Sequence, residues 1–267
     1  MRTCFTESTR IIAAVLACLL FAFLTGCSST HVAPVPVVTA VSGGGQSTTV
    51  DTPFAAPFVA TVTINGQPAT GVAVVFTAPA DPGCTFANGS IDPNGVETET
   101  DITDSTGTAT SSICTADTVS GSYIAGAATL PAAGVTFAVS NMSGPPATIT
   151  AASGTPQSAE VDTAFADPLV ANVLDEFGNP VSGASVTFTA PGGGGVVHGG
   201  EPPSGTFATS GTAQEVDTTD ANGNATSSTF TANDATGTYN VTGVVTELDP
   251  VDFALTNTDD GGVRKQK

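Results

Sequence analysis

Val186-Thr-Phe-Thr-Ala-Pro191 is a short stretch in which apolar side chains occupy every second position. This period of two is typical of a β-strand that buries one of its faces. Val74-Val-Phe-Thr-Ala-Pro79 repeats the stretch almost letter for letter, about 110 residues earlier. The fold is therefore decided by a strand pattern that the chain uses twice.

The duplication extends over most of the chain. Gln46–Phe54 matches Gln157–Phe165, Asp104–Ser112 matches Asp220–Ser228, and Val135–Asn141 matches Val251–Asn257. A unit of about 110 residues has the size of one small domain and is longer than a solenoid repeat. We therefore predict two tandem modules, at residues 36–143 and 144–258, followed by a polar tail at 259–267. Arrays of this kind more often serve reach, display or binding than catalysis.

The strand pattern continues outside the quoted stretches. Phe58, Ala60, Val62 and Ile64 alternate with Val59, Thr61 and Thr63, and Leu169, Ala171 and Val173 repeat the pattern in the second module. Threonine and valine are plentiful, and Gly, Pro, Asn and Asp interrupt the runs about every ten residues. These features predict an all-β fold of two immunoglobulin-like β-sandwiches.

The first residues predict export. Arg2 and Arg10 form a positively charged n-region before the apolar run 11–24. This run is too short for an ordinary membrane span. Leu24-Thr-Gly-Cys27 resembles the bacterial lipobox, which implies cleavage of a signal peptide at 1–26, lipidation of Cys27 and a tether at 27–35. The alternative is an ordinary secretory signal that ends near a cysteine. More than one acyl chain would anchor the protein stably in a membrane. By the sorting rule known for some Gram-negative lipoproteins, the lack of Asp after the cysteine, where Ser28 stands, favours the outer membrane.

Two cysteines remain after those of the signal peptide and Cys27 are set aside. Cys84 and Cys114 both lie in the first module, and an exported protein meets an oxidising environment. We expect a disulfide between them, the alternative being a metal site or a reactive thiol. In the second module the aligned residues are Gly205 and Phe230, so we expect packing to replace the bond there.

Longer motifs in the second module resemble a known family. Asp175-Glu-Phe-Gly-Asn-Pro-Val-Ser-Gly183, Thr219-Asp-Ala-Asn-Gly-Asn-Ala225 and Gly237-Thr-Tyr-Asn-Val241 resemble the bacterial Ig-like domains of the invasin/intimin type (group 1). The first module matches less well, because Asn65-Gly-Gln-Pro68 shortens its first turn. The resemblance implies sandwiches that serve as rigid segments on bacterial surfaces. Tyr123 and Tyr239 have the spacing of the corner tyrosine of Ig folds, whose hydroxyl bonds to the backbone.

The charge distribution excludes several classes of partner. The formal net charge is −19, and no Lys or Arg occurs between Arg10 and Arg264. Without cations the modules cannot neutralise phosphates, so we expect no nucleic-acid partner. We also expect no catalytic residues, since neither a nucleophile motif nor a metal-ligand pattern is present.

Two groups of residues are candidate sites of lower specificity. The pairs Asp101 with Asp104 and Asp217 with Asp220 could offer oxygen ligands to calcium, or they could simply stabilise turns. The glycine-rich segment from Gly192 through Gly195 and His198 to Gly205 is a candidate binding loop, or a place where insertions are tolerated. We favour the turn-forming role of the aspartates and expect no cofactor, with calcium as the alternative.

These observations together predict a lipid-anchored protein of the cell envelope, at the outer membrane and exposed at the surface. Its modules would act as a rigid stalk or as a scaffold for adhesion to a protein or glycan partner. The alternative is a periplasmic carbohydrate- or protein-binding module that has no stalk role.

Overall fold

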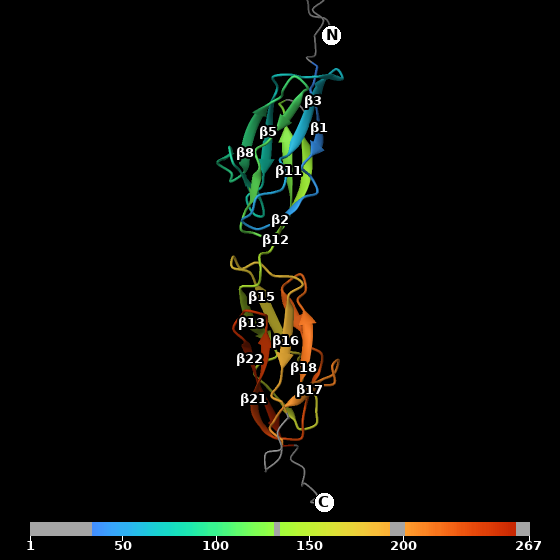
Figure 1. Ribbon diagram of the computed structural model, residues 1–267, viewed down its shortest axis with the longest axis vertical. Helices are drawn as coiled ribbons and strands as arrows, with labels where there is room; N and C mark the ends of the chain where they lie inside the picture. Colours follow the sequence, from blue (N-terminus) through green and yellow to red (C-terminus); the bar gives the residue numbers. More distant parts are fainter. Residues whose placement is uncertain (1–33, 131–133, 193–200, 260–267) are drawn as a thin grey trace, which may run out of the picture. The chain divides into compact units, whose positions relative to one another are not determined.

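The computed structural model describes residues 34–130, 134–192 and 201–259 (Figure 1). These residues form strands joined by turns and contain no helix, so none of them belongs to a helix long and apolar enough to cross a membrane. The predicted all-β fold is therefore confirmed. The signal peptide and Cys27 lie outside the described residues.

The strands that precede the Pro-Pro pair at 145–146 form one group, which we call module 1. One sheet has the order β1-β3-β4, with β9 also paired to β3, and the other has the order β2-β12-β11-β5-β8-β7. A separate two-stranded antiparallel sheet pairs β6 with β10. The strands are β1 Val37–Ser42, β2 Ser47–Thr49, β3 Val59–Ile64, β4 Gln67–Pro68, β5 Ala73–Ala78, β6 Cys84–Phe86, β7 Ser90–Ile91, β8 Glu97–Ile102, β9 Thr108–Thr110, β10 Cys114–Ala116, β11 Gly121–Ala128 and β12 Val135–Met142.

The strands after the Pro-Pro pair form module 2, which repeats this plan. Its sheets have the orders β13-β15-β19 and β14-β22-β21-β16-β18, and β17 pairs with β20. In both modules a short early strand runs parallel to the last strand, while the other pairs are antiparallel. The strands are β13 Thr148–Ser153, β14 Gln157–Glu160, β15 Val170–Leu174, β16 Ser185–Thr189, β17 Gly205–Phe207, β18 Gln214–Thr218, β19 Asn224–Thr226, β20 Phe230–Ala232, β21 Gly237–Val244 and β22 Val251–Thr258.

The alternating residues form the cores. Phe58, Ala60 and Val62 are buried, whereas Ile64, at the end of its strand, is only partly buried. Phe188 and Phe253 fill the second core, with ring centroids 5.8 Å apart. Each module has its own cluster of buried apolar residues, and no residue belongs to both clusters. Burying one such aromatic side chain contributes roughly 1.5–3 kcal/mol relative to leaving it in water.

Hydrogen bonding along the chain does not stop at the boundary between the cores. The described residues from Val35 onward form one compact unit that includes both modules. The predicted residue limits of the two domains stay a prediction, but the strands and cores divide at the linker 143–147. The side chains that bridge this linker form the candidate site described below.

Candidate functional site

The disulfide lies between β6 and β10 of module 1. Cys84 and Cys114 are joined, with Cα atoms 5.7 Å apart, and both are buried. The bond closes a loop with a sequence separation of 30 residues. Both cysteines belong to the buried hydrophobic cluster of module 1, which fits a structural bridge.

A phenylalanine ring replaces this bond in module 2. Gly205 and Phe230 occupy the equivalent strand positions, in β17 and β20. A Cβ atom added at Gly205 would lie 2.7 Å from Cζ of Phe230. The ring also packs against Phe207, with 4.6 Å between the centroids and 46° between the ring planes. Packing therefore takes the space that the sulfur atoms fill in module 1.

The candidate binding loop is only partly within the described residues. Gly195 and His198 lie outside them, whereas Gly192 is exposed. Gly205 is not in a loop: it begins strand β17 and is buried opposite Ala232. The requirement for glycine there comes from the carbonyl oxygen of Thr231 and the adjacent Phe230 ring, so Gly205 does not contribute to a binding surface.

The aspartate pairs stabilise the turns in which they lie. Oδ1 of Asp104 accepts hydrogen bonds from the backbone N–H groups of Thr106 at 2.8 Å and Thr108 at 3.0 Å. Oδ1 of Asp220 accepts in the same way from Asn222 and Asn224, at 2.8 and 3.0 Å.

These bonds favour the ionised carboxylates. The side-chain hydrogen bond from Thr106 and the backbone bonds lower the pKa of Asp104, and the backbone N–H of Asn224 is the main cause that lowers the pKa of Asp220. Asp101 and Asp217 each accept one backbone N–H from the next strand, from Thr110 and Thr226. These contacts account for the repeated spacing of the aspartates in the two modules. The expectation of no cofactor stays a prediction, with calcium as its alternative.

Two glutamates missed by the sequence analysis, Glu99 and Glu215, have carboxylates that are buried at equivalent positions of the two modules. Oε1 of Glu99 accepts the backbone N–H of Ser112 at 2.9 Å, and Oε2 accepts the hydroxyl of the same serine at 2.6 Å. Glu215 binds Ser228 in the same bidentate manner. Both glutamates are 8% exposed. The signal was present in the repeated Thr-Ser-Ser motif. Each glutamate accepts hydrogen bonds from the second serine of that motif, Ser112 or Ser228.

The two corner tyrosines differ. The hydroxyl of Tyr239 lies 3.1 Å from the carbonyl oxygen of Ser204 and 3.0 Å from Oδ1 of Asn257, and it can donate to either. The hydroxyl of Tyr123 is buried but has no hydrogen-bond partner among the described residues. Burial raises the pKa of both tyrosines, and the charge of Asp117 raises that of Tyr123 further. The expected hydroxyl-to-backbone contact is thus found for Tyr239 and not for Tyr123.

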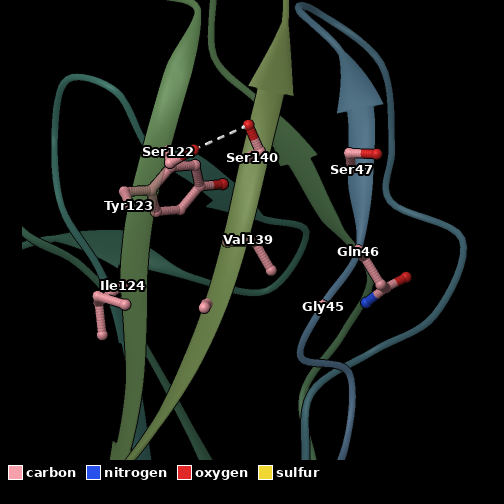
Figure 2. Close-up of a pocket in the computed structure, with 9 residues that line it drawn as sticks. Gly45, Gln46, Ser47, Ser122, Tyr123, Ile124, Val139 and Ser140 are labelled. Atoms are coloured by element: carbon pink, nitrogen blue, oxygen red, sulfur yellow. Dashed lines mark hydrogen bonds between the residues drawn. The ribbon is translucent and has the colours of Figure 1, made fainter.

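A surface hollow of about 370 Å³ lies over β11 and β12 beside the residues leading into β2 (Figure 2). Ile124 and Val139 contribute apolar surface, and the hydroxyls of Ser122 and Ser140 are 3.2 Å apart. Gln46 at its margin is already held by the carbonyl oxygen of Gly43. Tyr123 is the one titratable residue among those that line the hollow. Its lining contains serine, glutamine and tyrosine side chains, and no Asp, Glu, His, Cys, Lys or Arg.

The contacts across the linker involve the Asp175–Asn179 turn, which we call the plug turn. Nδ2 of Asn179 donates to the carbonyl oxygen of Thr118 at 2.9 Å, and its Oδ1 accepts the backbone N–H of Ser120 at 2.9 Å. The side-chain amide of Asn179 therefore bonds to one backbone carbonyl and one backbone N–H of a module 1 loop. The backbone of a neighbouring β-strand would make the same pair of bonds. Asn179 is 8% exposed. Gly178 has a φ of 85° and provides the left-handed residue that the turn requires.

Asp175 organises the plug turn from within. Its Oδ1 accepts the backbone N–H groups of Phe177 and Asn179, and its Oδ2 accepts Nδ2 of Asn179 at 2.9 Å and the linker N–H of Gly144 at 2.9 Å. Burial of Asp175, which is 2% exposed, opposes ionisation. The hydrogen bonds from Asn179, Gly144 and Phe177 outweigh it, so the pKa of Asp175 lies below its ordinary value. An ionised carboxylate thus fixes both the Asn179 amide and the linker.

The described residues contain no group of three or more His, Cys, Asp or Glu side chains that could hold a metal ion. The contacts described above are built from hydrogen bonds between side chains and the backbone. The contact of the plug turn with Thr118 and Ser120 joins the two modules.

No protein-family model matches the chain, and no curated protein matches it. Several solved structures resemble it. They include the D0–D1 domains of intimin, with 21% identity, coverage of 83% of this chain and 96% of that chain, and a TM-score of 0.31.

Two other similar structures are adhesins or invasins. The Escherichia coli adhesin FdeC has 18% identity, coverage of 82% of this chain and 63% of that chain, and a TM-score of 0.40. Invasin, described as a bacterial integrin-binding protein, has 20% identity, coverage of 85% and 40%, and a TM-score of 0.36. The chain spans less than two thirds of either. At these identities and TM-scores the likenesses carry no argument about function, and the fold rests on the strand pairing given above.

Proposed function

We propose that the mature protein is anchored in the cell envelope by lipid on Cys27 and that its two Ig-like modules act as a stiff stalk or interaction scaffold. The observation that carries this proposal is the joint at the linker, where Asn179 pairs with Thr118 and Ser120. A flexible pair of binding domains would have no need of a buried carboxylate that orders both the linker and the contact. The proposal places the anchor in the outer membrane and the modules at the cell surface.

Three features of the chain support this role. The Leu24-Thr-Gly-Cys27 sequence provides the acceptor for lipid, and the modules hold no cation that would draw them toward nucleic acid. The absence of Lys and Arg between Arg10 and Arg264 also leaves trypsin-like proteases no site in either module. Resistance of this kind suits a protein that meets an extracellular environment.

The anchor is tested by growing the producing bacteria with an alkyne-tagged fatty acid. The wild-type protein should carry the tag and fractionate with outer membranes, and the Cys27→Ser variant should carry none and leave the membrane fraction. Wild-type protein without the tag in a soluble fraction would overturn the proposal.

Exposure at the surface is tested by treating whole cells with a protease that cleaves after apolar residues, with a periplasmic protein as the control. Loss of the modules while the control stays intact supports surface display. Protection of both, followed by cleavage after lysis, would contradict display and favour a periplasmic protein.

A further inference from the structure

The loop of module 1 that receives the plug turn has a close counterpart in module 2. We call Asp117–Ser120 the first acceptor loop and Asn233–Thr236 the second acceptor loop. Each begins directly after the strand that follows the Thr-Ser-Ser motif and ends at a glycine, Gly121 or Gly237. A Cβ atom added at either glycine would lie 3.0 Å from Cγ of a proline, Pro82 or Pro203.

The two acceptor loops are held in the same conformation. In the first, the backbone N–H of Val119 donates to Oδ1 of Asp117 at 2.9 Å, and Nδ2 of Asn141 donates to that same oxygen at 3.0 Å and to the carbonyl oxygen of Val119 at 3.3 Å. In the second, every partner has its equivalent. Ala235 N–H donates to Oδ1 of Asn233 at 3.3 Å, and Nδ2 of Asn257 donates to Asn233 Oδ1 at 2.9 Å and to the Ala235 carbonyl oxygen at 3.0 Å.

The loops differ in what their outward groups meet. In the first, the Thr118 carbonyl and the Ser120 N–H pair with the Asn179 amide. The equivalent groups in the second are the Asp234 carbonyl and the Thr236 N–H. Both residues are exposed, and neither group has a hydrogen-bond partner within the part of the chain that the structure describes. The second acceptor loop therefore presents, already ordered, the acceptor and donor that an asparagine amide satisfies in the first.

From this match we infer that the second acceptor loop is a docking surface for a further Ig-like module that bears an Asp-x-x-Gly-Asn turn. The occupant is defined by chemistry. Its asparagine must present Nδ2 to the Asp234 carbonyl and Oδ1 to the Thr236 N–H, and an aspartate behind it must hold that amide. Module 2 supplies the example of such a turn in Asp175, Gly178 and Asn179. The turn of module 1 at Asn65-Gly66-Gln67 lacks the aspartate and the length to act as the occupant.

The test gives the full mature chain a module with this turn. A copy of residues 142–258 is placed directly after Asn257, so the added plug turn follows Asn257 at the spacing that separates Asn141 from Asn179. The added copy carries Thr236→Ser, which distinguishes its peptides by mass. Amide hydrogen exchange is then measured for residues 233–237 of the original module, with and without the added copy. The first acceptor loop of the same molecule serves as the internal standard.

Docking should slow exchange of the Thr236 amide about tenfold, as one hydrogen bond formed between packed modules does, and Ser120 should be protected throughout. Asn179→Ala in the added copy should remove the protection of Thr236, whereas Asn172→Ala there should preserve it, because Asn172 bonds only within its own module.

Two results would overturn the inference. One is unchanged exchange at Thr236 while Ser120 is protected and the core amides of the added copy show that it has folded. The other is fast exchange of the Ser120 amide, because the contact of Asn179 with the first acceptor loop, on which the inference is based, would then not form in solution. Either result leaves the lipid anchor and the surface location untouched, because those are measured on cells.

Discussion

The backbone N–H of Ser120 donates to Oδ1 of Asn179 at 2.9 Å across 59 residues of sequence. The same side chain donates to the carbonyl oxygen of Thr118, so one amide satisfies two backbone groups of the other module. Because Asp175 already fixes the position of that amide, little side-chain freedom is lost when the contact forms. The amide that makes the contact is thus positioned by a residue of its own module.

Replacing Asn179 should loosen the joint without unfolding either module. Asn179→Ala removes both hydrogen bonds to module 1 and should weaken the contact by about 1–3 kcal/mol. Backbone relaxation measured by NMR should then show the two modules tumbling more independently, with faster exchange of the Ser120 amide. The matched control is Asn172→Ala, which removes two hydrogen bonds inside module 2. Equal tumbling of wild type and Asn179→Ala would show that the joint does not depend on this amide.

Acid should open the same joint. The pKa of Asp175 is lowered in the folded chain, so its stabilising effect is complete above the ordinary aspartate pKa of about 3.9. The effect is lost as the pH falls through the lowered pKa, because protonation removes acceptors for Gly144 and Asn179. Ser120 amide exchange, corrected for its intrinsic pH dependence, should therefore rise below about pH 4 in the wild type. In Asp175→Asn the joint should already be loose at neutral pH, and a joint that stays closed there would refute the role of the charge.

The two tyrosines allow a matched comparison of hydrogen bonding. Tyr239→Phe removes a hydroxyl that is bonded to Ser204 or Asn257, and it should destabilise module 2 by about 1 kcal/mol. Tyr123→Phe removes a buried hydroxyl that has no partner among the described residues, so it should leave module 1 unchanged or slightly more stable. Urea unfolding followed by circular dichroism would measure both. A larger loss for Tyr123→Phe than for Tyr239→Phe would contradict the assignment.

The sequence was sufficient for the fold because its signals are local. The alternation at Phe58–Ile64 and the repeated Val-x-Phe-Thr-Ala-Pro stretch indicate strands that are buried on one face. Successive side chains of a strand point to opposite faces, so a period of two places all the apolar side chains on the same face. The Cys84–Cys114 pairing also followed from elimination, and Gly205 and Phe230 aligned with it correctly. The duplication supplied an internal check on each of these inferences.

The joint could not be predicted in this way. In the sequence, the Asp175–Gly183 motif indicated a resemblance to a family, and in the structure Gly178 adopts the left-handed conformation there. The side chain of Asn179, however, is directed to Thr118 and Ser120, about 60 residues earlier, and nothing in the local pattern specifies a partner so remote. The Glu99 and Glu215 clamps were missed for a related reason: a glutamate in a strand normally indicates the solvent face, and only tertiary packing shows that both are buried.

Gly205 should tolerate no side chain. A Cβ atom there would lie 2.7 Å from Cζ of Phe230 and would also overlap the carbonyl oxygen of Thr231, so Gly205→Ala should destabilise module 2 by about 1–3 kcal/mol. Gly44→Ala is the control, because its Cβ would have no neighbour closer than 3.7 Å. Thermal unfolding of the two variants should separate them. Similar stability would mean that the Phe230 ring moves aside at little cost.

Reduction should affect module 1 alone. The Cys84–Cys114 bond closes a loop of about 30 residues, and the chain-entropy model gives a stabilisation of about 3–4 kcal/mol for such a loop. Hydrogen exchange in a strong reductant, or in the double variant C84A/C114A, should therefore quicken in the strands around Phe58 and Phe137. Exchange around Phe188 and Phe253 should stay unchanged, because Phe230 and Gly205 hold the equivalent strands there by packing. Equal acceleration in both modules would instead indicate that the two cores unfold as one, despite sharing no buried residue.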